Sequence, residues 1–300
     1  MAASTLRFFR ARVSGITDVT PTFRRFTFAG ADLGDYGDPG FDQRIKIVFP
    51  TATVGLDAMP IDDDWYTRWR DMAEAERPPF RTYTTRFVRN DEREVDVDMV
   101  AHDVLGPASD WIARATVGDE VLILAPTTAH TGVSYGIDFV PPAHTESILL
   151  AGDETAAPAI AVILEQLPAE ARGVVVLEVP HPDDAAYLPR HPGFEYRVGA
   201  RGDGGRHAYL VPEVEQAADR LAPEGRGGEV EEIDIDTETL WEVPRTAKGG
   251  AALKRATLYS WLAGEAGAIK ALRRHLVAER GVDRRAVAFM GYWRLGKAEN

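Results

Sequence analysis

The chain has 300 residues, of which 45% are hydrophobic and 27% are charged, a composition typical of a globular protein with room for two domains. Its net charge of −13 disfavours binding to a nucleic-acid backbone, and it has no run of roughly 20 apolar residues that could span a membrane. Because cysteine is absent, disulfides, thiolate nucleophiles and cysteine-ligated clusters are excluded, so a redox function would need an organic cofactor.

The N-terminal sequence and the spacing of the histidines lead to expectations about localisation and metal binding. The N-terminus has no apolar core of signal-peptide length, and we therefore expect a cytoplasmic protein without membrane insertion. The seven histidines show neither HxxxH nor HExxH spacing, so no metal site is expected and a metallohydrolase is disfavoured.

Short strands dominate the predicted structure of the first half. Residues 5–14 and 22–28 are rich in aromatic and β-branched side chains and are separated by a turn, which predicts an antiparallel pair. A short helix is predicted within residues 62–76, and further strands at residues 45–49, 94–100 and 117–124. The acidic and aliphatic alternation of the 94–100 strand is the pattern of a half-buried strand. Several short strands with turn signals suggest a small closed barrel.

Residues 81–86 form the most unusual of these predicted strands. Successive side chains of a strand point to opposite faces. One face would carry Arg81, Tyr83 and Thr85, and the other Thr82, Thr84 and Arg86. Because charge and an aromatic ring stand where a core strand would have valine or isoleucine, this strand suits a planar, phosphorylated ligand.

A phosphate-binding turn is predicted at residues 106–113. Gly106 and Pro107 precede Ser109 and an apolar periodic run, which is typical of a turn that leads into a helix. The free backbone N–H groups and the helix dipole at such an N-terminus attract phosphate. An ordinary capped helix is the alternative.

The second half changes to alternating strands and helices, which predicts a parallel sheet. The predicted strands are residues 147–151, 174–179, 194–198, 257–263 and 287–290. The predicted helices are residues 159–166, 211–221 and 266–280. Residues 222–250 are glycine-rich and acidic, and part of this segment is expected to be a mobile loop.

Two glycine turns, at residues 152–155 and 264–266, each lie between an apolar strand and a helix. Neither matches GxGxxG, and each alone could be a connector with a helix cap. Because the carboxyl ends of parallel strands meet at one edge of a sheet, the two turns together predict a nucleotide site at that edge.

Five motifs occur in a characteristic order: RTYTTR, GPASDW, LLAGDETAAPAIAVILEQLP, YSWLAGEAGAIKALRRHLVAERG and GYWRLG. In this order they resemble the siderophore-interacting proteins, flavin-dependent ferric-siderophore reductases related in fold to ferredoxin–NADP reductases. The resemblance covers nearly the whole chain. It implies a two-domain α+β fold with an N-terminal antiparallel β-barrel that binds FAD, residues 1–142, and a C-terminal α/β parallel-sheet domain that binds NAD(P), residues 143–300.

The resemblance also implies which residues bind FAD. Arg81 and Arg86 would lie near the anionic pyrophosphate, because a guanidinium group forms a bidentate fork with phosphate. Tyr83 would lie against the isoalloxazine, and Thr84 would form a hydrogen bond near its N5. The flavin would also run along the strand residues Asp98, Val100 and His102, and the phosphates would be received by Gly106, Ala108 and Ser109.

For the nicotinamide nucleotide, NADPH or NADH, the resemblance implies contacts from both glycine turns. These residues are Gly152, Asp153, Glu154 and Thr155, followed by Gly264, Glu265 and Ala266. Thr155 would point towards the flavin, so the catalytic positions are Thr84 and Thr155. Glu178 lies at the end of the second predicted strand and Asp183 and Asp184 follow it, and carboxylates near the adenosine ribose would favour NADH.

A ferric siderophore is the substrate that the resemblance implies. Many such chelates are anionic, so a basic lining near the flavin is expected. The resemblance points to Lys46, Arg294 and Lys297 for this lining, although a solvated strand lysine is an equal interpretation of Lys46. The sequence departs from the family pattern at Asp103, at residues 125–128 and at residues 198–201.

The expected function is therefore hydride transfer from NAD(P)H to FAD, followed by single-electron transfer to a ferric siderophore and release of Fe(II). One alternative keeps the flavin but changes the acceptor, as in a general NAD(P)H-flavin or quinone reductase. The other is a non-catalytic siderophore- or nucleotide-binding protein. A monomer or weak dimer is expected.

Overall fold

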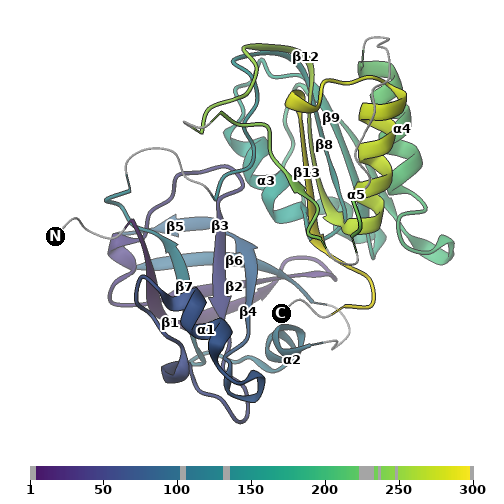
Figure 1. The fold of residues 1–300 in the computed structure, drawn as a ribbon. Helices are drawn as coiled ribbons and strands as arrows, with labels where there is room; N and C mark the ends of the chain where they lie inside the picture. Colours follow the sequence, from purple (N-terminus) through teal and green to yellow (C-terminus); the bar gives the residue numbers. More distant parts are fainter. Residues whose placement is uncertain are drawn as a thin grey trace. The chain divides into compact units, whose positions relative to one another are not determined.

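The structure is a computed structural model that describes residues 5–101, 106–130, 136–222, 233–235, 238–246 and 249–297. The chain divides into two compact units. The N-terminal unit is formed mainly by Met1–Pro39 and Gln43–Gly136, and the C-terminal unit by Gly40–Asp42 and Ile137–Lys297. The first holds an antiparallel sheet and the second a mostly parallel sheet with helices, which confirms the expected two-domain fold (Figure 1). The domain boundary expected between residues 142 and 143 stays a prediction. The assignment of one cofactor to each domain stays a prediction as well.

The N-terminal unit is a seven-stranded antiparallel sheet in the order β4-β3-β7-β1-β2-β6-β5. Its strands are β1 (Leu6–Asp18), β2 (Phe23–Ala29), β3 (Arg44–Val48), β4 (Phe80–Thr84), β5 (Phe87–Arg89), β6 (Glu94–Val100) and β7 (Glu120–Pro126). Two helices accompany it, α1 (Trp65–Asp71) and α2 (Pro107–Arg114). Among the described residues, the ladder stays open between β4 and β5, so the sheet is a half-barrel and not the closed barrel expected.

The core of this unit follows from alternation along the strands. In β1, Phe9, Ala11 and Val13 are buried, while Arg10 and Arg12 between them are exposed. The α2 helix adds Trp111, whose ring lies 5.2 Å from Phe26 and 5.0 Å from Phe49 between centroids. A helix placed against an open half-barrel thus completes the core.

Three expectations for this unit need correction. The strand expected at residues 81–86 ends at Thr84, and β5 starts three residues later. The helix expected within residues 62–76 covers only α1, followed by a 3-10 turn at Glu74–Glu76. The expected half-buried strand β6 is buried along most of its length, because arginines pair with its acidic residues Asp96 and Asp98.

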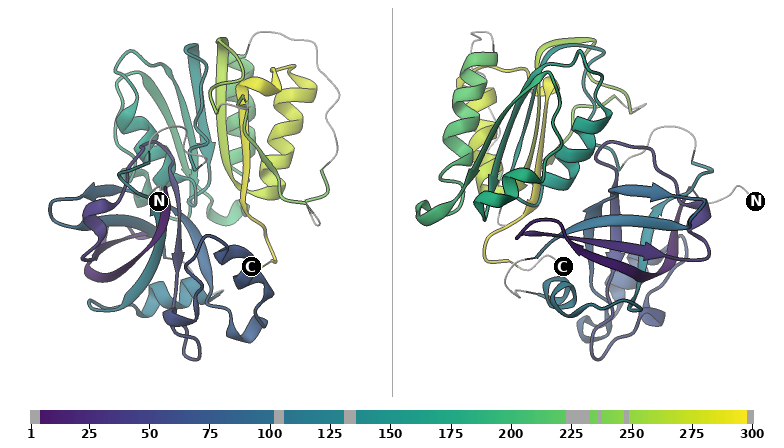
Figure 2. Two further views of the ribbon diagram at one scale, coloured as in Figure 1. Left: turned by 60° about the vertical axis from the view of Figure 1, so that its left-hand side comes forward. Right: turned by 180° about the vertical axis from the view of Figure 1, so that it is seen from behind.

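The C-terminal unit is a six-stranded sheet in the order β10-β9-β8-β12-β13-β11, parallel except where β11 meets β13. Its strands are β8 (His144–Gly152), β9 (Gly173–Val179), β10 (Phe194–Ala200), β11 (Trp241–Glu242), β12 (Arg255–Glu265) and β13 (Val287–Trp293). Its helices are α3 (Ala157–Gln166), α4 (Leu210–Leu221) and α5 (Ala266–Arg273). The α4 and α5 helices cover one face of the sheet and α3 covers the other (Figure 2).

Because both faces are covered, the central strands are apolar without alternation. The residues of β8 from Ile148 to Ala151 are all buried, as the sequence pattern predicted for a parallel sheet. The helix expected at residues 266–280 is α5 followed by a π-helical stretch at Arg274–Glu279. The last strand is longer than expected and reaches Trp293.

The remaining short elements lie in connecting segments. The two-residue strand β11 falls in the segment 222–250 that was expected to be partly a loop, and residues 223–232, 236–237 and 247–248 of that segment lie outside the described residues. No helix in the described part of the chain combines the length and hydropathy needed to cross a bilayer. Further 3-10 turns are Leu33–Asp35, Leu56–Ala58, Pro182–Ala186, Gly202–Gly204 and Arg284–Ala286.

Candidate functional site

The edge strand β4 carries the unusual stretch that begins at Arg81. In its register with β3, Arg81 is opposite Ile47 and Tyr83 is opposite Ile45, so both side chains share the face of these core residues. Tyr83 is half-buried, with its ring nearly perpendicular to Phe49 at 6.2 Å between centroids. The alternation of faces predicted from the sequence is therefore confirmed as far as the strand extends.

The opposite face of β4 presents Thr82 beside Lys46 of β3. The Lys46 Nζ atom donates to Thr82 Oγ1 at 3.4 Å and lies 4.8 Å from the centroid of the Phe80 ring. Arg81 Nη1 donates to the backbone oxygen of Phe80 at 2.7 Å. Lys46 is half-buried and has neighbours, so it differs from the simple solvated lysine that was the alternative.

The chain turns inward where β4 ends. Thr84 is 7% exposed and Thr85 is 4% exposed. The Thr85 hydroxyl lies 2.8 Å from the hydroxyl of Tyr36, inside the unit. Thr84 therefore has little surface for a ligand, and its hydrogen bond near the flavin stays a prediction.

Arg86 belongs to a buried ion-pair cluster. Arg25 donates to both oxygens of Asp98 at 2.7 and 2.8 Å, and Arg86 Nε lies 3.5 Å from Asp98 Oδ2. The two guanidinium carbons lie 4.9 and 4.1 Å from the ring centroid of Phe87. Because the Asp98 side chain is fully buried, it needs these cations. Arg86 thus has a structural partner, and its contact with a pyrophosphate stays a prediction.

A second pair continues this cluster along β6. Arg89 donates to both oxygens of Asp96 at 2.9 and 2.8 Å and also to Glu94 at 3.1 Å. Burial raises the pKa of Asp96, but the hydrogen bonds and charge of Arg89 outweigh burial and hold that pKa below its usual value. Asp96 is therefore held as a carboxylate by Arg89, with smaller contributions from Thr27 and Arg25.

Between β4 and β6 lies a gap in the sheet, here called the seam, where backbone groups of both strands are not paired in a ladder of the described strands. The β4 strand is at the edge of the sheet, and β5 pairs only with residues 94–96 of β6. Within the described strands, one side of β4 and one side of residues 97–100, including Val100, lie outside the ladders. Such a seam can offer backbone donors and acceptors to a planar ligand. His102 and Asp103, which continue this strand in the sequence, lie outside the described residues.

The α2 helix confirms the predicted helix start after Gly106. Pro107 is its first residue, and in the described part of the chain no side chain caps its N-terminus. No described residue other than its chain neighbours lies within 4 Å of a Cβ atom built on Gly106. Ala108 is buried and Ser109 is half-buried in the first turn. A helix start without a side-chain cap suits an anion, whereas phosphate binding itself stays a prediction.

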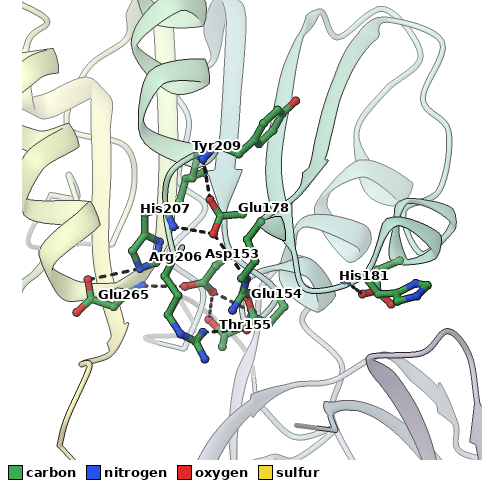
Figure 3. Close-up of polar contacts among 12 residues, drawn as sticks. Asp153, Glu154, Thr155, Glu178, His181, Arg206, His207, Tyr209 and Glu265 are labelled. Atoms are coloured by element: carbon green, nitrogen blue, oxygen red, sulfur yellow. Dashed lines mark hydrogen bonds and ion pairs between the residues drawn. The ribbon is translucent and has the colours of Figure 1, made fainter. Parts of the chain in front are cut away.

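At the carboxyl edge of the C-terminal sheet, Asp153 joins three strands. Its Oδ1 accepts from Thr155 N at 2.9 Å and from Thr155 Oγ1 at 2.5 Å. Its Oδ2 accepts from Glu265 N at 2.9 Å (Figure 3). The same oxygen accepts from Trp293 Nε1 at 2.8 Å. The side chain is nearly fully buried. Asp153 therefore fixes the ends of β8, β12 and β13 and orients the Thr155 hydroxyl.

The two glycines of the predicted turns are required by this close packing. A Cβ atom on Gly152 would lie 2.3 Å from the backbone oxygen of Ala263. One on Gly264, which has a φ of +148°, would lie 2.7 Å from Asp153 Oδ2. Gly264 is the penultimate residue of β12, and Ala266 begins α5, so the second turn is shorter than expected. Contact of either glycine with a nucleotide stays a prediction.

Two carboxylates occupy the starts of α4 and α5. Glu178, which is fully buried at the end of β9, accepts from the backbone N–H groups of His207, Tyr209 and Leu210 at 2.7, 3.1 and 3.0 Å. Glu265 Oε2 accepts from Ala268 N at 3.0 Å. The Glu178 carboxylate is thus used by the fold, which does not agree with the ribose contact expected from the sequence.

The other two acidic residues expected near a ribose lie in the 3-10 turn after β9. Asp183 is exposed, with 78% of its side-chain surface accessible. Asp184 is buried, and its Oδ2 accepts from His181 N at 2.9 Å. Only Asp183 of this pair presents a carboxylate to the solvent.

Glu154 holds two arginines of the loop that follows β10. Arg201 Nη2 donates to Glu154 Oε2, and Arg206 Nη1 lies 3.5 Å from Glu154 Oε1. The Arg206 guanidinium also lies 5.0 Å from the ring centroid of Trp293. Burial and the neighbouring charge of Asp153 raise the pKa of Glu154, although Arg201 opposes this shift.

The sequence analysis missed this loop. His207 has a φ of +67°, a conformation unusual for a residue other than glycine, and its Nε2 lies 3.8 Å from Glu265 Oε2. The glycines at 202, 204 and 205, followed by Arg206 and His207, gave a local signal for a functional loop. Metal-ligand spacing does not detect such a loop, because His207 belongs to no HxxxH or HExxH pattern.

The basic residues expected at the substrate belong to different units. Lys46 is in the N-terminal unit, whereas Arg294 and Lys297 are in the C-terminal unit. Arg294 Nη1 donates to the backbone oxygen of Ile235, and Lys297 N donates to the backbone oxygen of Arg294 at 3.2 Å. No group of three or more acidic or histidine side chains in the described residues is arranged to hold a metal ion. The joint role of the basic residues stays a prediction.

Comparisons with known proteins place these features in a family. Residues 12–130 match the model of the siderophore-interacting FAD-binding domain, and residues 145–296 match that of the siderophore-interacting protein. An uncharacterised protein of Mycobacterium bovis is 35% identical, covering 94% of this chain and 88% of its own. The ferric vibriobactin reductase of Vibrio cholerae is 29% identical, covering 94% and 87%.

A solved structure agrees with the sequence relatives. The siderophore-interacting protein SipS from Aeromonas hydrophila superposes with a TM-score of 0.67 at 27% identity, covering 98% of this chain and 94% of its own. The family models together match both the antiparallel and the parallel unit. The chain therefore belongs to the siderophore-interacting protein family.

Proposed function

We propose that the chain is an NAD(P)H-dependent, FAD-containing reductase of ferric siderophores that releases iron as Fe(II). The observation that supports this most is the match of both units to siderophore-interacting family models, one of them an FAD-binding domain. A relative of nearly the same length is named for ferric vibriobactin reduction. When bound, the flavin would supply the chemistry of accepting a hydride and releasing single electrons.

The N-terminal unit fits a flavin dinucleotide in its chemistry. The seam between β4 and β6 has backbone positions outside the ladders, and Tyr83 offers a half-buried aromatic surface beside it. Arg81 is a half-buried cation on the same face as Tyr83. The open N-terminus of α2 after Gly106 can receive a phosphate group. Arg81, Tyr83 and the α2 turn are therefore the residues assigned to FAD.

In the C-terminal unit, the N-terminus of one helix suits the pyrophosphate of a nicotinamide nucleotide better than the N-termini of the other helices. Glu178 and Glu265 already occupy the starts of α4 and α5. The start of α3 at Ala157 carries no capping side chain in the described residues. We therefore assign the nucleotide pyrophosphate to the turn from Asp153 to α3, with Thr155 held in a fixed orientation by Asp153.

The substrate would be an anionic ferric chelate. Lys46 is the cation of the N-terminal unit assigned to it, with Arg294 and Lys297 as further candidates from the C-terminal unit. No acid, base or nucleophile is required for electron transfer, which agrees with a site built from ligand-positioning groups.

Steady-state assays of the FAD-loaded protein test this proposal. The protein is mixed with NADH or NADPH and with catecholate, hydroxamate and citrate chelates of Fe(III), and Fe(II) is captured by a chromogenic chelator. We expect Fe(II) formation that depends on the protein, the flavin and the nucleotide. Absence of Fe(II) with every chelate, despite bound flavin, would contradict the proposal.

The same assay distinguishes the alternatives. Rates with free flavin or a quinone that greatly exceed those with ferric chelates would identify a general flavin or quinone reductase. A preparation that FAD does not reconstitute, but that binds a ferric chelate, would identify a binding protein without turnover. Each outcome replaces the proposed function by a named alternative.

A further inference from the structure

The carboxyl edge of the C-terminal sheet is rich in buried carboxylates. Asp153, Glu154, Glu178 and Glu265 are 1%, 3%, 0% and 7% exposed. They come from the ends of three different strands and lie together in Figure 3. Two arginines of the neighbouring loop pair with this group, Arg201 and Arg206. The local charge of these six residues is therefore negative, which opposes the binding of a further anion.

Glu154 engages both arginines. Arg201 is only 14% exposed in its side chain, pairs with Glu154 and lies 3.7 Å from Glu178. Arg206 is 37% exposed in its side chain, and its contacts are Glu154 at 3.5 Å and the Trp293 ring. Arg206 is thus the cation that a ligand can reach, and Glu154 is the group that competes with the ligand for it.

NADPH and NADH differ in the charge that they would bring to this acidic edge of the sheet. NADPH carries a 2′-phosphate, which is doubly charged near neutral pH and is commonly held by arginine forks. To provide such a fork, Arg201 or Arg206 would have to leave Glu154, and a buried carboxylate next to Asp153 would lose one of its two arginine partners. NADH has a neutral 2′-hydroxyl and makes no such demand.

We propose that Glu154 makes this chain select NADH over NADPH by retaining Arg201 and Arg206. This inference rests on the proposed function in so far as it assumes a nicotinamide nucleotide at this edge. Glu154 is a specificity-determining residue in this account, because it acts on the nucleotide through the arginines. It replaces Glu178, which the sequence favoured for the same preference but which the fold uses to hold the start of α4.

Equilibrium binding tests the inference independently of turnover. Isothermal titration of the FAD-loaded protein with NAD⁺ and with NADP⁺ gives the ratio of the two dissociation constants. Wild type should favour NAD⁺. Glu154→Gln should shift the ratio towards NADP⁺ on the order of tenfold, because a charge-assisted hydrogen bond from a released arginine becomes available. Adding Arg206→Ala to this variant should remove the gain.

Glu195 provides a matched control, since it also bridges two arginines. Its Oε1 accepts from Arg197 at 2.7 Å and its Oε2 from Arg220 at 2.5 Å. It lies near the start of β10, at the opposite end of the strand from the Arg201 loop. Glu195→Gln should therefore leave the ratio unchanged.

Arg206→Ala in the wild-type background gives a second test that alters only a partly exposed side chain. We expect no change in the ratio, because Glu154 already engages Arg206. A loss of NADP⁺ affinity in this variant would show that Arg206 is available to the 2′-phosphate, and would overturn the inference.

The remaining outcomes separate the inference from the proposed function. An unchanged ratio in folded Glu154→Gln protein contradicts the inference alone. The expected shift without any Fe(II) formation supports the inference and contradicts the proposed function. Failure of both nucleotides to bind wild type and variant contradicts both.

Discussion

The two units each contain an arginine–carboxylate cluster, and the clusters differ in charge balance. In the N-terminal unit, three arginines, Arg25, Arg86 and Arg89, pair with four carboxylates, of which Glu94, Asp96 and Asp98 lie on β6 and Glu92 lies just before it. At the carboxyl edge of the C-terminal unit, carboxylates outnumber arginines. The same chemical groups therefore create a nearly balanced scaffold in one unit and a more acidic edge in the other.

The pKa shifts follow this difference. Burial raises the pKa of Asp96, but Arg89 reverses the shift and lowers it below the usual value. Burial and the charge of Asp153 raise the pKa of Glu154, and Arg201 opposes this shift without reversing it. The first cluster serves the fold, whereas a role of the second in ligand discrimination is the inference proposed above.

The largest expected effect on stability comes from breaking the ion pairs of Asp98 on β6 with Arg25 and Arg86. Asp98→Ala removes the fully buried partner of Arg25 and Arg86 and should lower the free energy of unfolding by about 3–5 kcal/mol. Urea unfolding followed by circular dichroism measures the change. Asp18→Ala, which breaks an exposed pair with Arg24, is the control and should cost at most about 1 kcal/mol. Equal effects of the two variants would contradict the structural role of the cluster.

A pH effect should distinguish the units. Asp42, which is fully buried in the C-terminal unit, accepts from Asp138 N, Phe139 N and Trp261 Nε1 at 3.1, 3.0 and 2.9 Å. Burial and the nearby charge of Asp138 raise the pKa of Asp42 from 3.8 to about 6. Since the folded-state pKa is above the unfolded value, ionisation opposes folding.

The stability of the C-terminal unit should therefore fall as the pH rises from about 4 to about 6, by up to about 3 kcal/mol, and then level off. Hydrogen exchange of amides in β8, compared with those in β1, measures this change for each unit. The Asp42 contribution should be absent from β1. A C-terminal unit that instead gains stability over this pH range would contradict the assignment.

Gly264→Ala should disturb the acidic edge itself. A Cβ atom there would lie 2.7 Å from Asp153 Oδ2 at a φ of +148°, so we expect a loss of about 2 kcal/mol. Gly118→Ala is the matched control, because Gly118 has a φ of +103° but nothing within 4 Å of a Cβ atom. Thermal unfolding should show a smaller loss for the control, which measures backbone strain alone. The reverse order would show that the contact with Asp153 is unimportant.

The smallest expected effect concerns the substrate. Lys46→Gln should raise the KM for an anionic ferric chelate on the order of tenfold, with kcat less affected, because one charge-assisted contact is lost. Lys254→Gln, at an exposed position of the C-terminal unit, should leave KM unchanged. Equal KM values for the Lys46 variant and wild type would show that Lys46 only packs against Phe80.

Local patterns predicted most of the fold. The change from period-two strands to alternating strands and helices at the middle of the chain gave both sheet types, because each pattern reflects which faces are buried. The local pattern gave the wrong burial for β6, whose aspartate carboxylates are buried. Their burial depends on Arg25 and Arg89, which belong to other strands, so no local pattern within β6 reports it.

The sequence predicted where the candidate site residues lie better than it predicted what each of them contacts. The glycine turns at 152 and 264 predicted a nucleotide site at one sheet edge, which stays a prediction, because the close approach of Ala263 and Asp153 already accounts for both glycines without a ligand. Glu178 was read as a ligand contact because it ends a strand, and its hydrogen bonds to the start of α4 come from a loop about 30 residues away. Such long-range pairing follows from the fold and not from spacing.

The central claim is electron flow from a nicotinamide nucleotide through FAD to a ferric siderophore, and anaerobic absorption spectroscopy tests it most directly. The FAD-loaded protein is titrated with NADH, and a ferric siderophore is then added together with a chromogenic Fe(II) chelator. We predict that NADH bleaches the visible flavin absorption, and that the siderophore restores it while Fe(II) appears. A flavin that NADH does not bleach, or that stays bleached in the presence of the siderophores tested, would contradict the account.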